Sequence, residues 1–255
     1  DALSWRVAYQ VFSALVLVIG LFATLVCVRS YPDEVGLRPF GARLSSGDAS
    51  SVHDGERPRV CGVSALVMFR SPVFYLLILS MGIFNSLTVT VNLYATYIHH
   101  LGALGLAGIT PERPVMMASV TVSCLMAVSA GSKVLLGAIS DKSMIGALAI
   151  AFVGGVVSIC CMWFGSSSPE IIMFGGAPGG ILYAAIDALA PSITRQIVGP
   201  RDYTIIYSRV AIVVNLAGAA AATVFAAVAE ASWEAEWAMS LLLIAVAFVS
   251  CVAAV

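Results

Sequence analysis

The side chains best placed to do chemistry are two charged groups inside long apolar segments, Lys133 and Asp187. A cation at the centre of a bilayer costs about 2.5 to 3.5 kcal/mol, so it persists where it pairs with an anion or faces water. The rise per residue places Lys133 about 6 to 8 Å and Asp187 about 12 Å inside the ends of their segments. We therefore expect the ammonium of Lys133 to meet an anionic substrate or the carboxylate of Asp187.

This pair also offers a coupling mechanism. An anion that binds Lys133 weakens its attraction for Asp187, and the freed carboxylate is then able to bind a proton. Such an exchange predicts proton-coupled transport of the anion. Two simpler interpretations remain open: the two residues form a purely structural ion pair, or the ammonium of Lys133 extends to the lipid headgroups.

Uncharged polar side chains in the apolar segments are candidates for hydrogen bonds to a substrate. They are Asn85, Asn92, Tyr94 and Asn215. Asn85 and Asn92 lie seven residues apart and so share one helix face. The alternative is that these groups hydrogen-bond between packed helices.

The stretch GSKVLLGAISDK, residues 131–142, ends in a polar turn that predicts a cytoplasmic gate. Its gate residues are Gly137, Ser140, Asp141 and Lys142. We expect Asp141 to pair with one of three arginines on the same side of the membrane, while Gly137 lets helices approach. These arginines are Arg195, Arg201 and Arg209. The alternative is local, because Ser140 or Asp141 would also cap the next helix.

A further segment is interrupted by Pro178 and four glycines at 175, 176, 179 and 180. Proline removes one backbone hydrogen bond and glycines let a helix bend, so the pattern predicts a hinge at Pro178. A static kink or close helix packing explains it equally well, and Gly218 indicates close packing alone.

The composition indicates the kind of protein that must position these residues. Hydrophobic residues make up 60% of the 255 residues and charged residues 11%, whereas soluble domains carry about 25% charged residues. We therefore expect an integral membrane protein that contacts a lipid bilayer and no nucleic acid. None of the three histidines stands at ligand spacing from a carboxylate within an apolar segment, so we expect no metal, no cofactor and no enzyme activity. Because the chain begins with Asp1, we interpret it as a fragment.

Seven segments are long and apolar enough to cross a bilayer as helices. They are 7–28, 73–98, 115–136, 144–164, 171–194, 204–229 and 237–255. Eleven of the thirteen lysines and arginines fall on one side when the first segment runs inward, which makes that side the cytoplasm. The N-terminus is then outside and the C-terminus cytoplasmic, in the cell membrane. Four tryptophans are expected as interfacial anchors: Trp5, Trp163, Trp233 and Trp237.

The chain divides into three parts: residues 1–28, a polar cytoplasmic linker at 29–70, and a six-helix domain at 71–255. The linker ends in GVSALVMFR, residues 62–70, which suits a helix in the interface, and Ser71 and Pro72 then begin the next helix. Within the helical segments, the first, fourth and seventh have almost nothing polar at mid-depth. We therefore expect every third helix to face lipid and the others to line an interior.

The motif Gly137-x-x-x-Asp141-Lys142, followed by a tight turn, resembles the repeated loop motif of the major facilitator superfamily. The long central linker, the pattern of polar helices by threes and the Trp5-Arg6 pair are similar to the same superfamily. This resemblance implies an all-α membrane protein whose first helix is the sixth of twelve and whose other six form the C-terminal half. The N-terminal half would then be a missing partner.

Two short segments resemble particular groups within the superfamily. RSYPDEVGLRPF at 29–40 and PSITRQIVGPRDY at 191–203 are similar to the oxalate/formate antiporters and monocarboxylate transporters. The monocarboxylate transporter group places an arginine at the position of Lys133. The resemblance implies a secondary active transporter that moves a small organic anion, a monocarboxylate, by alternating access with proton symport or anion exchange. The alternative is a seven-helix membrane receptor, which has the same number of spans.

Overall fold

The computed structural model describes residues 5–27, 62–105 and 114–254. The chain forms two compact units, residues 1–56 and 57–255. The described part of the first unit is helix α1 (Trp5–Phe22), which continues into a π-helical turn at Ala23–Cys27. This agrees with the first predicted span as far as Cys27. The side chain of Trp5 and linker residues 28–61 lie outside the described residues.

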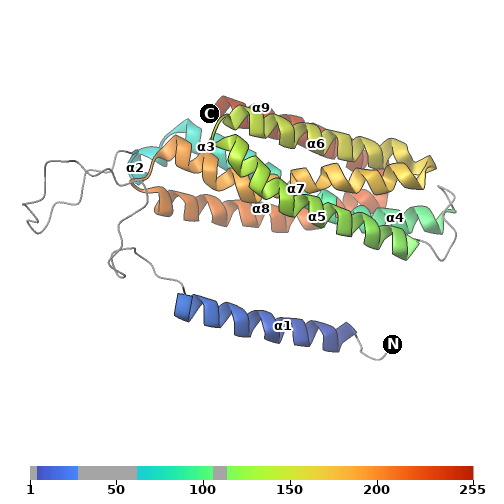
Figure 1. Ribbon diagram of the computed structural model, residues 1–255. Helices are drawn as coiled ribbons and strands as arrows, with labels where there is room; N and C mark the ends of the chain where they lie inside the picture. The colour runs from blue at the N-terminus through green and yellow to red at the C-terminus, as the bar shows by residue number, and fades with distance from the viewer. Residues whose placement is uncertain (1–4, 28–61, 106–113, 255) are drawn as a thin grey trace, which may run out of the picture. The chain divides into compact units, whose positions relative to one another are not determined.

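The second unit is built of helices that run along a common direction (Figure 1). They are α2 (Ala65–Met68), α3 (Pro72–Asn92), α4 (Tyr94–Ala103), α5 (Pro114–Ser140), α6 (Met144–Phe164), α7 (Pro169–Val198), α8 (Tyr203–Ala231) and α9 (Trp233–Ala254). Within the described residues, α1 and these helices provide seven candidate membrane spans. The predicted all-helical membrane fold is therefore confirmed.

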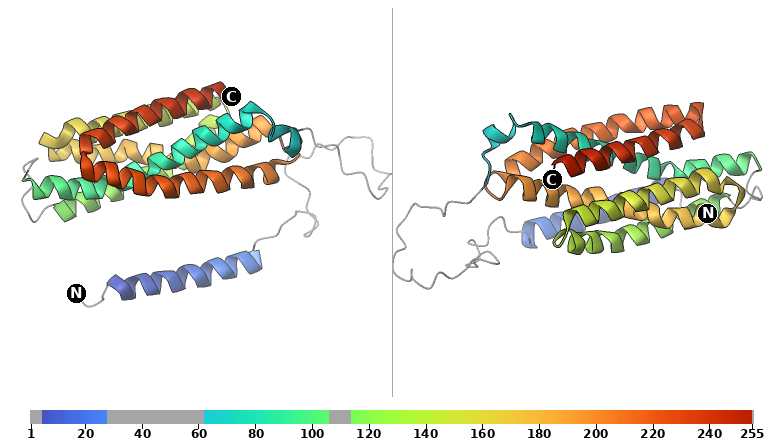
Figure 2. Two further views of the ribbon diagram at one scale, coloured as in Figure 1. Left: turned by 180° about the vertical axis from the view of Figure 1, so that it is seen from behind. Right: turned by 90° about the horizontal axis from the view of Figure 1, so that it is seen from above.

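The bundle has two ends, named here after the short helices that mark them. At the α2 end, α3, α6 and α8 begin and α5, α7 and α9 finish, so the C-terminus lies at the same end of the bundle as α2 (Figure 2). At the α4 end lie the last residues of α4 and the first residues of α5, α7 and α9. Helix α3 begins as predicted, because Ser71 accepts a hydrogen bond from the Val73 amide at 3.3 Å and Pro72 is the first helical residue.

Helix α7 occupies the centre of the packing, with α5 and α6 against it, while α3 packs against α8 and α9. Two glycines of α7 allow its backbone to approach α5 closely. A Cβ atom at Gly176 would lie 2.7 Å from the carbonyl oxygen of Thr121, and one at Gly180 would clash with the carbonyl of Leu125. Helix α7 stays helical through Pro178, and these close approaches support packing as a reason for its glycines, whereas the hinge at Pro178 stays a prediction. The close packing expected of Gly218 is confirmed by its contact with the side chain of Asn85.

The fourth and seventh spans, which carry few polar residues at mid-depth, bury polar groups toward the α4 end. Ser158 of α6 and Ser240 of α9 are fully buried, and so is Glu236. Helix α9 begins at Trp233, four residues before the predicted start, so Glu236 belongs to its first turn. The interfacial role expected of Trp237 is also wrong, because its side chain is 0% exposed and is buried within the bundle.

Candidate functional site

The two charged residues singled out from the sequence meet across α5 and α7. Nζ of Lys133 lies 2.8 Å from Oδ2 of Asp187, and the two side chains are 44% and 55% exposed. The helices extend seven residues beyond Lys133 and eleven beyond Asp187, so these residues lie about 10 and 16 Å from the helix ends. The pair is therefore deeper than the sequence segments indicated, and it lies on an exposed face of the bundle.

Aromatic hydroxyl groups of α8 lie beside this pair. Tyr207 interacts electrostatically with Asp187, and its ring stacks on that of Tyr203 with centroids 5.4 Å apart. Tyr203 in turn interacts with Arg195 of α7. Helices α5, α7 and α8 thus bring an ammonium, a carboxylate and the Tyr207 phenol together, whereas Tyr203 and Arg195 lie nearer the α2 end. Lysine and arginine offer only hydrogen-bond donors, which is the chemistry that binds a carboxylate.

The asparagines expected at the site have different environments. Asn215 is exposed on α8, and its amide donates to the Ala211 carbonyl of its own helix at 2.8 Å. Asn92 is exposed at the end of α3. Asn85, by contrast, donates to the carbonyl of Val214 at 2.9 Å across α3 and α8, so the interhelical alternative describes this residue.

Tyr94 does not line an accessible face, contrary to the expectation that it contacts substrate. Its side chain is 0% exposed, and its hydroxyl lies 2.7 Å from Oγ of Ser158. Ser158 donates its own proton to the carbonyl of Gly175 at 2.6 Å, so Tyr94 is the donor to Ser158. This chain of hydrogen bonds joins α4, α6 and α7, and it leaves no surface of Tyr94 for a ligand.

The expected gate residues gather at the α2 end without closing it. In residues 114–254, no ion pair within 4 Å joins Asp141 to any of its three proposed arginines. Asp141 and Arg195 instead line one groove of about 370 Å³ together with Ser140, Met144, Ser192 and Gln196. Arg201 and Lys142 are exposed. A Cβ atom at Gly137 would meet nothing within 4 Å, so no described segment approaches closely there.

The local alternative, in which Ser140 or Asp141 caps α6, is wrong. The residue that caps α6 is Ser143, whose Oγ accepts from the Gly146 amide at 3.1 Å. The hydroxyl of Ser140 donates a hydrogen bond to the carbonyl of Gly137 at 2.7 Å, within α5. The cap is displaced because α5 extends to Ser140, and Asp141 then falls in the turn between the helices.

The end of the linker is attached to the turn between α7 and α8. The amide of Ala65, which begins α2, donates to Oδ2 of Asp202 at 2.8 Å, and the Val63 amide donates to the Val198 carbonyl at 2.9 Å. The guanidinium of Arg209 lies 5.0 Å from the ring centre of Phe69. Sequence reasoning missed Asp202, because nothing local to residue 202 indicates a partner more than a hundred residues away.

In the ranges that the structure covers, no three His, Cys, Asp or Glu side chains gather as a metal site would require.

Comparison with known proteins gives one match. The profile of the Major Facilitator Superfamily matches residues 1–158, more than half of the chain. No curated protein and no solved structure matches it. The match includes helix α5, which carries Lys133, and the motif from Gly137 to Lys142 that resembles the loop motif of this superfamily. The chain therefore belongs to the major facilitator superfamily of membrane transporters.

Proposed function

We propose that this protein is a secondary active transporter that carries a small organic anion, a monocarboxylate, by alternating access. The observation that supports the proposal is the ion pair between Lys133 and Asp187, at 2.8 Å and partly exposed. An ion pair that served only to stabilise the fold would contribute little stability when it is exposed to solvent. An exposed ammonium deep within a span is, however, suitable for binding an anion.

The substrate carboxylate and Asp187 compete for the same ammonium. When the substrate binds Lys133, Asp187 loses its partner and becomes free to accept a proton. Transport of the anion together with that proton is symport. Return of the carrier with a second anion on Lys133, without the proton, is exchange. Tyr207 and Asn215 supply further hydrogen bonds to the anion, whereas Asn92, at the far end of α3, lies too distant along the bundle to reach it.

The α2 end is the cytoplasmic end in this proposal, with the N-terminus outside and the C-terminus inside the cell. Asp141 and Arg195 line the same groove, so a modest movement of α5 against α7 brings them into contact and closes it. Such a latch has to break in each cycle, which a weak surface ion pair permits. Movement around Pro178 in α7 would accompany it.

The exposed face of α5, α7 and α8 needs a second half to enclose the substrate. We propose that residues 71–255 form the C-terminal half, that residues 1–28 are the last helix of an N-terminal half, and that residues 29–70 link them. The 255-residue chain alone in liposomes is then expected to show no carboxylate uptake. Robust uptake by this chain would refute the two-half arrangement.

Uptake of radiolabelled carboxylates by the full-length transporter in proteoliposomes tests the anion site. Lys133→Ala is expected to lower carboxylate uptake about 10- to 100-fold, since it removes a charge-assisted contact. Lys133→Arg should retain part of the activity. Asp187→Asn should abolish the dependence of uptake on a proton gradient while anion exchange continues.

Glu170→Gln is the matched control, because Glu170 is an exposed acidic residue of the same helix α7. It should leave both activities unchanged. Normal carboxylate uptake by Lys133→Ala would show that Lys133 is not the anion site.

A further inference from the structure

A fully buried carboxyl group lies in the first turn of α9, away from the Lys133 and Asp187 pair. Glu236 is 0% exposed. Its Oε1 accepts a hydrogen bond from Oγ of Ser240 at 3.0 Å. Oγ of Ser240 in turn lies 2.8 Å from Oγ1 of Thr90 in α3. Its second oxygen, Oε2, has no hydrogen-bond partner within the described residues.

This environment is incomplete for a carboxylate. Burial of an ionised carboxylate is costly unless cations or several hydrogen bonds compensate it. No lysine, arginine or histidine of the described chain forms an ion pair with Glu236 within 4 Å. The amides at the start of α9 favour negative charge only modestly. An unsatisfied buried oxygen in a native fold calls for a proton, an ion or a water.

We infer that Glu236, Ser240 and Thr90 form a buried site for a monovalent cation. The cation is either a proton on the carboxyl or a sodium ion held by the carboxylate and the two hydroxyls. All three side chains offer oxygen, the ligand that hard cations take. A single carboxylate balances one positive charge, which favours a monovalent cation over Ca²⁺ or Mg²⁺. The cation site stands independently, whereas its use as the coupling ion rests on the proposed transport function.

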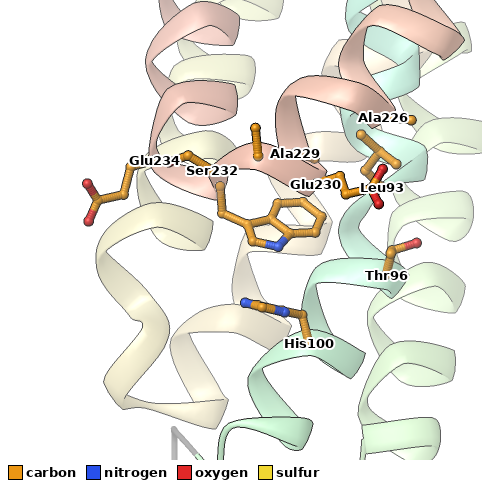
Figure 3. A pocket seen from close by; sticks show the side chains of 10 residues that line it. Leu93, Thr96, His100, Ala226, Ala229, Glu230, Ser232 and Glu234 are labelled. Atoms are coloured by element: carbon orange, nitrogen blue, oxygen red, sulfur yellow. The ribbon is translucent and has the colours of Figure 1, made fainter.

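A cavity of about 620 Å³ opens at the same turn of the protein. Its walls come from α4, α8 and α9: Leu93, Thr96, His100, Ala226, Ala229, Glu230, Ala231, Ser232, Trp233 and Glu234. Glu230 lies beside Leu93, whereas Glu234 points away from α4 (Figure 3). Trp233 is three residues before Glu236, or about 4.5 Å along the helix axis. The carboxylates of Glu230 and Glu234 favour the approach of cations to this end of the bundle.

Other titratable groups surround Glu236, so a pH response must be assigned by substitution. Helix α4 contributes Tyr94, which interacts electrostatically with Glu236, together with Tyr97 and His100. Helix α6 contributes Cys161, which interacts with Tyr94. The remaining groups are Glu230 of α8 and Glu234 of α9 itself. Helix α3 presents Thr90, which does not titrate.

Two measurements on the purified 255-residue chain in nanodiscs test this site. The first is the unfolding temperature in sodium chloride and in potassium chloride of equal ionic strength. The second is the infrared band of protonated carboxyl groups as a function of pH. Each is compared among the wild type, Glu236→Gln, which keeps the shape and removes the charge, and Glu170→Gln. Glu170 is the matched control because it is an exposed glutamate in the first turn of α7.

A sodium site predicts an unfolding temperature that rises with sodium concentration in the wild type and in Glu170→Gln, but not in Glu236→Gln. A proton site predicts equal unfolding temperatures in the two salts and a carboxyl band that titrates with pH. That band should persist in Glu170→Gln and be absent from Glu236→Gln. The absence of both a sodium response and a titrating Glu236 band would overturn the inference.

Ser240→Ala keeps the test decisive if Glu236→Gln does not fold. Loss of this hydroxyl should weaken sodium binding about tenfold, or shift the frequency of the carboxyl band if the cation is a proton. If Ser240→Ala leaves both readouts unchanged, the hydroxyl is not part of the site. Neither readout requires transport, so failure of the Lys133 experiments and failure of this inference are distinguishable.

Discussion

Asp187 and Glu236 are two carboxyl groups of one helical bundle with opposite surroundings. Asp187 is about half exposed and has Lys133 at 2.8 Å. Glu236 is fully buried, accepts a hydrogen bond from Ser240 on one oxygen, and has no partner for its other oxygen within the described residues. The first carboxylate is compensated by a residue that a substrate is able to take away. The second has to be compensated by something that enters the protein.

This difference separates two tasks that one residue would perform poorly. A group that exchanges partners needs access, so its pair is partly solvated and individually weak. A group that holds a small cation needs a dry site of oxygen ligands, where electrostatic interactions are stronger. Four predictions test whether buried and exposed polar groups of the bundle differ in this way, three of them on these carboxyl groups or their ion pair.

The largest expected effect comes from placing a lysine at each position. Glu236→Lys introduces an uncompensated charge into a fully buried site, and we expect a loss of about 3 to 5 kcal/mol in stability. Asp187→Lys places its ammonium near Lys133 on an exposed face, where repulsion should cost about 1 kcal/mol or less. Thermal unfolding in detergent, with fluorescence size-exclusion chromatography to detect aggregation, measures both. Equal losses would show that the two environments do not differ.

The second effect concerns transport. The double variant Lys133→Asp with Asp187→Lys keeps the ion pair but moves the positive charge from α5 to α7. Stability should stay near that of the wild type, whereas carboxylate uptake by the full-length transporter should fall about 10-fold or more because the anion contact is displaced. Full uptake by the swapped variant would indicate that the pair is structural. The single variants Lys133→Asp and Asp187→Lys are the reference for its stability.

The sequence allowed a reliable prediction of the helices and of the exposed pair. Long apolar segments have few alternatives in a bilayer, and a lysine and an aspartate within them are conspicuous. The resemblance to the superfamily added the loop motif at Asp141. Helix ends were predicted less well, because polar residues such as Glu236 at the start of α9 lower local hydropathy. Lower hydropathy indicates a loop even where tertiary packing buries the residue.

Partners that depend on the third dimension were not predictable. Tyr94 and Asn85 are both polar residues in one segment, yet one is fully buried against α6 and the other bonds to α8. Their spacing predicts which face of a helix each occupies, but not which helix lies against it. Asp202 and the amide of Ala65 were missed for the same reason.

The third prediction uses one buried and one exposed polar residue. Tyr94→Phe removes a hydrogen bond between buried groups and leaves Oγ of Ser158 with one partner fewer, so stability should fall by about 1 to 2 kcal/mol. Its KM for the substrate should stay unchanged. Asn215→Ala should show the reverse, a raised KM with unchanged stability. A changed KM in Tyr94→Phe together with unchanged stability would restore Tyr94 as a substrate contact.

The smallest expected effect is the response to salt. The Debye length falls from about 10 Å at 0.1 M to about 3 Å at 1 M, so an exposed ion pair is screened and a buried group is screened much less. The difference in stability between the wild type and Asp187→Asn should therefore shrink at high salt, from at most about 1 kcal/mol toward zero. The corresponding difference for Glu236→Gln should remain constant. Unfolding is best measured in N-methyl-D-glucamine chloride, because its large cation does not fit a site built of one carboxylate and two hydroxyls. A salt-dependent difference for Glu236→Gln would mean that solvent reaches Glu236, and the two carboxyl groups would then belong to one connected space.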